Sequence, residues 1–351
     1  MKKILVTGGC GYIGSHTIVD LLQNGFDVIS VDNNSRSTPI LLEGIEKITG
    51  KKVKNYKVDL CNYDETFAIF HENPDVEGII HFAAYKSVGE SVHEPLLYFE
   101  NNLFSLINIL KCVKEFDVPN FIFSSSCTVY GNPDEIPVTE TTPIKTPESP
   151  YGFTKQIGEQ IVSESTKTLA VQSILLRYFN PVGCHPSSYI GEIPVGKPAN
   201  LVPAITQTAI GKLPKLQVFG NDYPTRDGSC IRDYVHVCDI AHAHTLALQY
   251  LMKDENKLPC EIFNLGTGNG VTVLEAIKAF EKVSGVKLNY SIGPRRAGDI
   301  VAVYANNELA KKQLGWNPQY SLDDMMATAW KWELKLREDE VNYNHPGIEK
   351  N

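Results

Sequence analysis

A glycine-rich loop between a short apolar strand and a helix constrains the fold of this chain more than any other feature. The stretch TGGCGYIGSH spans residues 7–16 and directly follows the apolar run ILV at residues 4–6. Two spacings overlap in it, G-x-G-x-x-G beginning at Gly9 and G-x-x-G-x-x-G beginning at Gly8. Glycines here allow a tight turn, and the N-terminus of the following helix supplies N–H donors for a pyrophosphate. The loop therefore predicts a bound dinucleotide.

The acidic residue Asp32 indicates which dinucleotide is favoured. It ends the next predicted strand, 21 residues after Gly11. A carboxylate at this place bonds the 2′-hydroxyl of the adenosine ribose and repels a 2′-phosphate. NAD is therefore expected rather than NADP, although the nearby Arg36 leaves NADP open.

Strand-like and helix-like segments alternate through the first half of the chain. Short β-rich runs are expected at residues 3–7, 26–32, 53–59, 78–83 and 120–124. Helical spacing is found at residues 14–24, 63–72, 95–116 and 151–168. Alternating β and α segments predict an α/β fold with a Rossmann-type, doubly wound parallel sheet.

The amino-acid composition changes after Asn180, because Pro and Gly are frequent from residue 181 to residue 234. A helix is expected at 235–251, a strand at 260–266, and two or three more helices within 271–335. We therefore predict a dinucleotide-binding domain at 1–180, with returning segments at about 235–266. A smaller mixed α/β domain is expected to occupy most of 181–351.

Composition excludes several classes of protein. The 351 residues carry a net charge of −8 with no basic run, which argues against a nucleic-acid surface. No apolar stretch is long enough to span a bilayer, and the N-terminus lacks an export signal, so a cytoplasmic protein without a membrane partner is expected. Eight cysteines without a C-x-x-C pair predict reduced thiols, and the histidines show no ligand pattern, so no metal is expected.

A second constellation combines Ser126 with the segment YGFTK. Tyr151 and Lys155 stand four residues apart and so share one face of a predicted helix. A tyrosine with a free pKa of about 10 is a poor base at neutral pH. A lysine ammonium and a nicotinamide cation nearby would stabilise the phenolate and lower that pKa. Ser126 ends the strand leading here and can hydrogen-bond the same substrate hydroxyl, so these three residues are the predicted catalytic group.

With these motifs in place, the chain resembles the extended short-chain dehydrogenase/reductase family and, within it, the UDP-galactose (UDP-glucose) 4-epimerases. The likeness covers nearly the whole chain. Further runs that carry it are HFAAYKSVGES (81–91), FIFSSSCTVYG (121–131), SPYGFTK (149–155), LRYFNPVG (176–183), FGNDYPTRDG (219–228), IRDYVHV (231–237) and PRRAGD (294–299). In this family the glycine spacing that counts is G-x-x-G-x-x-G.

The resemblance implies interconversion of UDP-glucose and UDP-galactose by transient oxidation at C4, through bound NAD and a 4-keto intermediate. Tyr151 would take the proton of the 4-hydroxyl, Lys155 would lower the pKa of Tyr151, and Ser126 would polarise the 4-oxygen. The domain at 181–351 would mainly bind the UDP-sugar. The family also implies a homodimer, joined by the helices around 95–116 and 151–168.

Residue by residue, the resemblance implies two overlapping sets of contacts. The NAD set is Gly8, Gly11, Tyr12, Ile13, Gly14, Asp32, Asn33, Asp59, Leu60, Phe82, Ala83, Ala84, Lys86, Asn101, Ser124, Tyr151, Lys155, Tyr178 and Phe179. The UDP-sugar set is Lys86, Ser126, Tyr151, Phe179, Asn180, Asn200, Leu201, Gln217, Val218, Phe219, Arg232, Arg296, Asp299 and Val303. Arginines in these sets can neutralise a diphosphate with charge-assisted bonds.

The chain departs from the family pattern at two places. The loop at 34–37 does not align with the family's usual ribose-contacting residue, which leaves the adenosine-side contacts there open. Val303 stands where family members confined to plain hexoses tend to carry Tyr. A smaller side chain frees roughly the volume of an acetamido group, so activity on UDP-GlcNAc and UDP-GalNAc is also expected; the alternative is a packing substitution filled by neighbours.

Three other functions are conceivable for a chain with these motifs. A 4,6-dehydratase is disfavoured, because its family carries Asp-Glu after the strand-end Ser/Thr and this chain has Cys-Thr-Val at 127–129. A UDP-glucuronate 4-epimerase remains possible, because one arginine could meet a C6 carboxylate. A non-catalytic NAD-sensing protein of the same fold would be expected to lack the Tyr-Lys pair or the arginines, and both are present.

Overall fold

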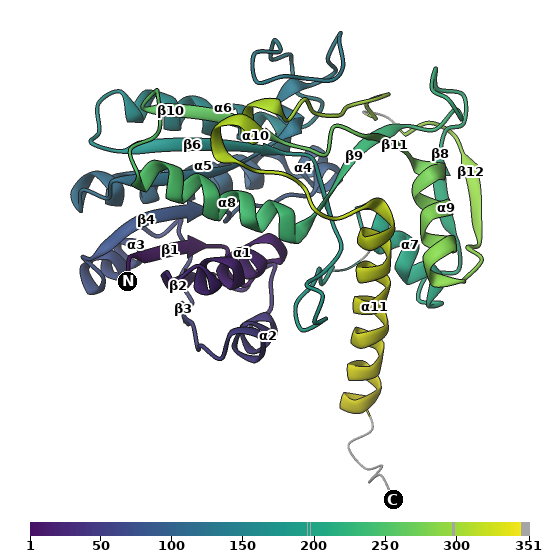
Figure 1. The fold of residues 1–351 in the computed structure, drawn as a ribbon, viewed down its shortest axis with the longest axis horizontal. Helices are drawn as coiled ribbons and strands as arrows, with labels where there is room; N and C mark the ends of the chain where they lie inside the picture. The colour runs from purple at the N-terminus through teal and green to yellow at the C-terminus, as the bar shows by residue number, and fades with distance from the viewer. Residues whose placement is uncertain (195, 197, 297–298, 345–351) are drawn as a thin grey trace, which may run out of the picture.

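Seven parallel strands form the central sheet, in the order β10-β6-β5-β4-β1-β2-β3. The computed structural model describes residues 1–194, 196, 198–296 and 299–344, with side chains to residue 338. The strands are β1 (Lys3–Thr7), β2 (Asp27–Val31), β3 (Lys54–Tyr56), β4 (Val76–His81), β5 (Asn120–Ser126), β6 (Gln172–Tyr178) and β10 (Cys260–Leu265). The order reverses at β1, as in a Rossmann fold, and confirms the predicted α/β class (Figure 1).

Both faces of this sheet are buried, which explains why its strands are continuous apolar runs. In β1, Ile4 and Val6 pack into one core and Leu5 into the other, because successive side chains point to opposite faces. Figure 1 shows α1 and α8 lying side by side on one face. Helices on that face are α1 (Tyr12–Gln23), α2 (Ile40–Thr49) and α8 (Val237–Met252). Helices on the other face are α3 (Tyr63–Glu72), α5 (Pro95–Glu115) and α6 (Pro150–Thr166).

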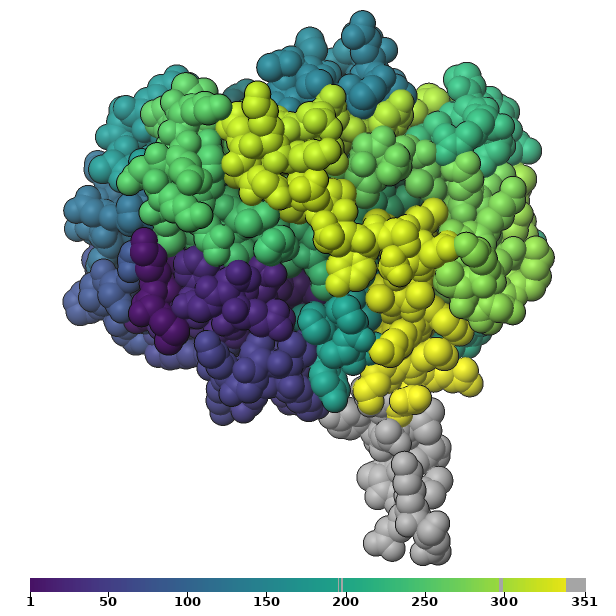
Figure 2. Space-filling model, viewed as in Figure 1, coloured from purple at the N-terminus to yellow at the C-terminus, as the bar shows by residue number. Residues whose placement is uncertain are grey.

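A third buried cluster lies beyond the carboxyl ends of the large sheet. It packs helices against two small sheets with orders β11-β9-β7 and β12-β8. Its elements are β7 (Asn180–Val182), α7 (Leu201–Ala209), β8 (Leu216–Phe219), β9 (Ile231–His236), β11 (Gly270–Thr272), α9 (Val273–Ser284), β12 (Tyr290–Gly293) and α11 (Leu322–Asn344). In Figure 2 the yellow residues that follow position 300 bridge this part and the large sheet.

Short elements complete the described chain. They are α4 (Val88–His93), the 3₁₀ helix η1 (Cys127–Tyr130) and α10 (Glu308–Leu314). None of the helices in the described residues is both long and apolar enough to cross a bilayer. All eight cysteines are free thiols, as the sequence predicts.

Several predicted element bounds are wrong. The helix expected at 235–251 begins only at Val237, because Val235 and His236 finish β9 and the His236 side chain caps the helix by accepting from the Cys238 N–H. The strand expected at 53–59 is reduced to the three residues of β3. The strand β6 and the helix α2 were not among the predicted elements.

Four buried histidines predict that the fold loses stability in mild acid. Burial lowers the pKa of His16 and His81 to about 3 and that of His236 and His244 to about 4. The unfolded chain therefore binds these protons near pH 6.5 while the folded chain does not, so stability is complete above 6.5 and falls as the pH drops. Below pH 6.5 and above its own pKa in the folded protein, each of these histidines lowers the unfolding free energy by about 1.4 kcal/mol for every pH unit.

The measurement is the urea midpoint of His81→Asn between pH 7 and 5, which should fall less steeply than that of the unmodified protein. The control is His242→Asn, since the side chain of Asp20 raises the pKa of His242 and its loss should not flatten the profile. Equal slopes for the His81 variant and the unmodified protein would show that His81 does not stay neutral.

Candidate active site

The glycine loop between β1 and α1 is shaped by the glycines of the wider spacing. Gly8 has φ +69°, in the left-handed region that favours glycine, and its N–H donates to the Val31 carbonyl at 2.7 Å. A Cβ on Gly14 would lie 2.2 Å from the Gly8 carbonyl oxygen. Gly11 is the N-cap of α1 and has no side chain to occupy the N–H groups of the first turn. These groups are free to bind an anion, so the loop fits a dinucleotide pyrophosphate.

Asp32 lies beside this loop at the end of β2. Its Oδ2 accepts the Cys10 N–H at 3.0 Å, and its Oδ1 accepts the Asn34 N–H at 2.9 Å and the Ser37 hydroxyl at 2.7 Å. These bonds fix the carboxylate next to the turn, as a ribose-binding role requires. They also give the 34–37 loop a role that the sequence left open, which is to orient Asp32.

Arg36, in the same loop, is paired with Glu90. Its Nη2 donates to Glu90 Oε1 at 2.7 Å, and its guanidinium carbon lies 5.0 Å from the centre of the Tyr85 ring. The guanidinium is therefore already paired with an acidic partner, an arrangement that favours NAD over NADP.

The predicted catalytic group comes together at the carboxyl end of β5. Ser126 is the last residue of β5, and α6 begins with Ser149 as its N-cap, which places Tyr151 and Lys155 on its first turns. Lys155 Nζ donates to the Ser124 carbonyl at 2.6 Å and lies 6.0 Å from the centre of the Tyr151 ring. The end of β5 and the start of α6 thus bring together three residues that span 29 positions of the sequence, from Ser126 to Lys155.

Burial shifts both titrating groups of this cluster toward their neutral forms. It raises the pKa of Tyr151 well above its usual value, with the neighbouring Tyr178 acting in the same direction and the Ser126 hydrogen bond opposing. Burial also lowers the pKa of Lys155 to about 8, against the attraction of the Glu159 carboxylate. A base at Tyr151 therefore needs additional positive charge in the site.

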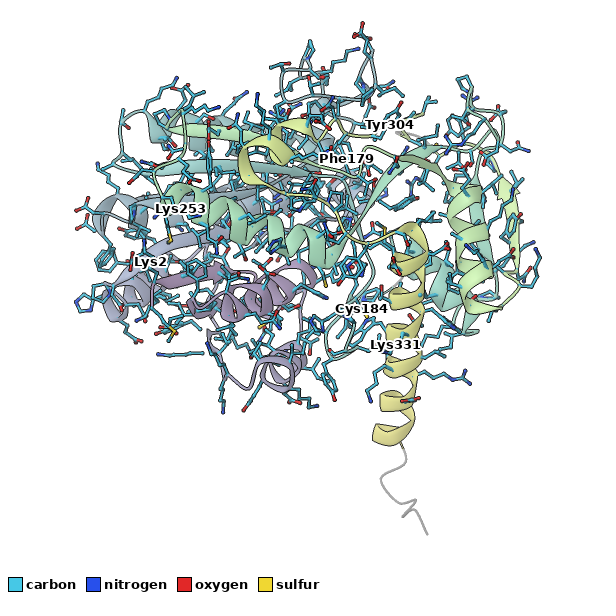
Figure 3. All side chains as sticks on the ribbon, in the orientation of Figure 1. Lys2, Phe179, Cys184, Lys253, Tyr304 and Lys331 are labelled. Atoms are coloured by element: carbon cyan, nitrogen blue, oxygen red, sulfur yellow. The ribbon has the colours of Figure 1, made fainter. Side chains whose placement is uncertain are left out.

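The remaining residues of the predicted NAD set gather at the carboxyl ends of the large sheet. They follow β2, β3, β4 and β6, or lie in α1, α5, β5 and the last position of β6, around the point where the strand order reverses. They are Tyr12, Ile13, Asn33, Asp59, Leu60, Phe82, Ala83, Ala84, Lys86, Asn101, Ser124, Tyr178 and Phe179. Figure 3 shows Phe179 where the large sheet meets the smaller part of the fold.

Part of the predicted UDP-sugar set forms one charged cluster. Arg296 Nη2 donates to Asp299 Oδ1 at 2.6 Å, and Arg232 Nη2 lies 3.8 Å from the same oxygen. The Arg296 guanidinium carbon is 5.3 Å from the centre of the Phe219 ring. Two cations and an aromatic face therefore converge, as an anionic nucleotide would require. Of the run PRRAGD, residues 297 and 298 lie outside the described residues.

Other members of this set lie on several different elements. Asn180 begins β7, Asn200 caps α7 at its N-terminus and Leu201 starts that helix, while Gln217 and Val218 lie in β8. Val303 is 2% exposed and belongs to the same core cluster as Phe179. The structure thus places Val303 in a packed environment, where side-chain size matters.

Two acidic residues of this region were not foreseen. Glu192 Oε1 accepts from Lys86 Nζ at 2.9 Å and from Asn200 Nδ2 at 3.4 Å. Asp233 is fully buried and accepts from Thr267 and from the N–H groups of 268 and 305. Apart from the contact between Glu192 and Asn200, which are eight positions apart, these bonds join residues 34 or more positions apart, so no local pattern could have predicted them. Within the described residues, no three acidic, His or Cys side chains group as a metal site would require.

The parallel sheet, the glycine loop and the Ser-Tyr-Lys group define an extended short-chain dehydrogenase/reductase. A sequence profile described as GDP-mannose 4,6 dehydratase matches residues 5–329. The UDP-glucose 4-epimerase uge1 of Schizosaccharomyces pombe is 47% identical over 95% of this chain and 94% of its own length. The Bacillus subtilis UDP-glucose 4-epimerase is 46% identical over 94% of this chain and 96% of its own length. The chain belongs to the UDP-glucose 4-epimerase family.

Solved structures agree with this assignment. The Bifidobacterium longum UDP-glucose 4-epimerase in complex with NAD⁺ and UDP superposes with a TM-score of 0.91 at 46% identity, over 95% of this chain and 98% of that one. The Stenotrophomonas maltophila enzyme, with bound NAD and formylated UDP-arabinopyranose, gives 0.93 at 44% identity, over 97% and 100%.

Proposed function

We propose that this protein interconverts UDP-glucose and UDP-galactose with a bound NAD, by transient oxidation at C4 through a 4-keto sugar. The observation that carries the proposal is the position of Ser126 at the end of β5 beside Tyr151 and Lys155 on the first turns of α6, in a fold that also has a glycine loop with free N–H donors. Close relatives that bear the epimerase name support it.

The glycine loop, the first turn of α1 and the Asp32 carboxylate would hold the dinucleotide, because they offer N–H donors to a pyrophosphate and an acceptor to a ribose hydroxyl. When bound, NAD supplies a reversible hydride acceptor for the sugar C4. The oxidised nicotinamide would also add the positive charge that Tyr151 needs in order to ionise.

Proton transfer falls to Tyr151. Its phenolate would accept the proton of the sugar 4-hydroxyl and return it to the 4-oxygen of the epimer. Lys155, whose Nζ is anchored on the Ser124 carbonyl, holds positive charge beside this phenol. Ser126 lies within hydrogen-bonding reach of Tyr151 and would orient the same substrate oxygen.

Nucleotide recognition would rest on the smaller part of the fold, which we propose as the UDP-sugar domain within 181–351. Arg232 and Arg296 would exchange their contact with Asp299 for the diphosphate. Binding through the nucleotide leaves the sugar itself few contacts, as is needed if the 4-keto sugar is to turn over in the site. The test is the rate on UDP-galactose against UDP-glucuronate, which should favour UDP-galactose at least tenfold; a higher rate on UDP-glucuronate would contradict the assignment.

We further propose that Val303 widens the sugar site enough for N-acetylated UDP-hexoses. The expected result for Val303→Tyr is a loss of activity on UDP-GalNAc with activity on UDP-galactose retained, because the larger ring fills the volume of the acetamido group. The measurement is kcat/KM on both substrates, with Ile300→Val, a shortening in the same segment, as control. Equal loss on both substrates would refute the size argument.

A homodimer through α5 and α6 is the proposed assembly. Leu96, Phe104 and Phe153 are 79%, 51% and 44% exposed on these helices, whereas Leu106 and Leu110 pack into the sheet core. Exposed large apolar side chains on neighbouring helices favour association. The variant Phe104→Glu should shift the protein to monomer in analytical ultracentrifugation, and Leu258→Glu, an exposed residue elsewhere, should not. A monomeric unmodified protein would contradict the proposal.

A further inference from the structure

Two donors from separate segments converge on a single oxygen of the protein itself. Lys86, in the loop after β4, and Asn200, before α7, both donate to Glu192 Oε1, at 2.9 and 3.4 Å. A cation and an amide meeting at one oxygen is the arrangement with which proteins bind an oxygen of an anionic ligand. Both donors belong to the set that the family resemblance assigns to ligands. The carboxylate of Glu192 therefore stands where an oxygen of a ligand would be expected.

The N-terminus of α7 supports this interpretation independently. Asn200 is the N-cap residue of this nine-residue helix, yet its side chain makes no capping hydrogen bond. Asparagine at this place normally accepts an N–H of the first turn. Here the amide reaches Glu192 instead, and the N–H groups of the first turn have no side-chain cap. These donors and the positive end of the helix dipole favour a negative group nearby.

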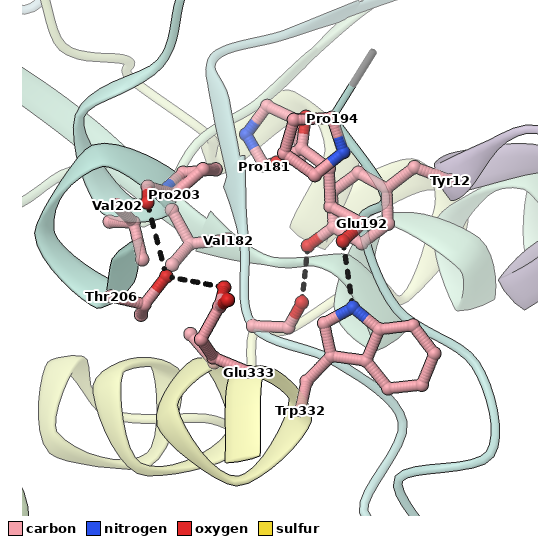
Figure 4. A pocket seen from close by; sticks show the side chains of 12 residues that line it. Tyr12, Pro181, Val182, Glu192, Pro194, Val202, Pro203, Thr206, Trp332 and Glu333 are labelled. Carbon is pink, nitrogen blue, oxygen red and sulfur yellow. Dashed lines mark hydrogen bonds between the residues drawn. The ribbon is translucent and has the colours of Figure 1, made fainter. Parts of the chain in front are cut away.

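The backbone around Glu192 is firmly held, so the carboxylate is the part that can move. Its carbonyl accepts from Trp332 Nε1 at 2.7 Å, as Figure 4 shows, and Ile190 is fully buried. A Cβ on Gly191 would lie 2.5 Å from the Trp332 ring, so only glycine lets the chain lie flat on the indole. An exchange of partners by Glu192 would therefore proceed by rotation of its side chain, with the backbone held in place.

We propose that Glu192 is a positioning residue that sets the affinity for the UDP-sugar. Its carboxylate holds Lys86 and Asn200 in the ligand-free protein and releases them to the diphosphate on binding. Breaking the contacts of Glu192 with Lys86 and Asn200 costs free energy when the ligand binds. The ligand is therefore held less tightly than its contacts with these two residues alone would allow. This inference rests on the proposed function, because it assumes that a UDP-sugar is the ligand.

The test is the dissociation constant of UDP, measured by titration calorimetry on the protein as purified. Glu192→Gln keeps the size of the side chain and removes its charge, so UDP should bind about twofold to fivefold more tightly, the range for a partly exposed ion pair. The KM for UDP-galactose should fall by a similar factor without a rise in kcat. Glu164→Gln, which removes a carboxylate from an exposed pair on α6, should leave both constants unchanged.

If the role of Glu192 were purely structural, the change in UDP affinity would be in the opposite direction, since the loss of its contacts would then weaken UDP binding. Unchanged or weaker binding of UDP by Glu192→Gln would overturn the inference while leaving the proposed function intact. If that variant does not fold, Glu192→Ala must show the same gain. Absence of UDP binding by the unmodified protein would overturn the proposed function and this inference together.

Discussion

Replacing Tyr151 with Phe is expected to lower the kcat for UDP-galactose by about 10²–10⁴-fold, the usual contribution of a positioned acid or base. The change removes one oxygen from a partly buried side chain beside Ser126 and Lys155. The phenol oxygen of Tyr151 is the only group proposed to accept the proton of the sugar 4-hydroxyl. A water molecule in its place would be a much weaker base than a phenolate. The KM should change much less than kcat, since the contacts proposed for the nucleotide lie on Arg232 and Arg296 and not on Tyr151.

The matched control for this prediction is Tyr290→Phe, which removes the same oxygen from an exposed residue of β12. It should retain full turnover. Both variants should show the thermal midpoint of the unmodified protein. Turnover of Tyr151→Phe within about twofold of the unmodified protein would remove Tyr151 from the proposed proton transfer, because a real acid–base group contributes about 10² or more.

The second large effect concerns the stability of the strands that carry the site. Arg177 in β6 and Glu159 in α6 form a buried two-point ion pair, with Nε–Oε1 at 2.8 Å and Nη2–Oε2 at 2.6 Å. Both side chains are almost fully buried, and Glu159 also accepts the hydroxyl of Ser125, next to Ser126. Replacing Arg177 with Met leaves a buried carboxylate without its partner, which costs about 3–5 kcal/mol of unfolding free energy.

This loss would be measured as a shift in the urea midpoint at constant slope. The double variant Arg177→Met with Glu159→Gln should recover part of it, because no buried charge then remains. Lys167→Met, which breaks the exposed pair with Glu164, should change the stability by less than about 1 kcal/mol. If Arg177→Met costs no more than Lys167→Met, the buried pair does not stabilise the fold.

Local patterns were sufficient to predict the parts of the site that lie close together in the sequence. Gly8 and Gly14 are six positions apart, and Tyr151 and Lys155 are four positions apart. The geometry of one turn or one helix is enough to bring the members of each pair together. The parallel sheet followed from the alternation of short strands and helices. The loop and the Tyr-Lys pair could be predicted because each lies within a single turn or helix, and the sheet because its strands and helices alternate along the chain.

Contacts between distant segments could not be predicted in this way. The convergence of Lys86 and Asn200 on Glu192 joins a loop after β4 to the start of α7, and no periodicity relates them. The position of Val303 in the core likewise depends on how the chain after residue 300 returns to the large sheet. Strand β6 is a short apolar run, which periodicity alone does not distinguish from a helix segment.

If 4-epimerisation proceeds by oxidation and reduction at C4 of a UDP-hexose, the hydrogen on C4 must leave and return as a hydride, and its fate can be followed. Purified protein would be incubated with UDP-galactose in D₂O, and the product followed by NMR. UDP-glucose should accumulate with protium at C4, because the same hydride leaves and returns within the site. Deuterium at C4 of the product, or no UDP-glucose at all, would contradict this mechanism.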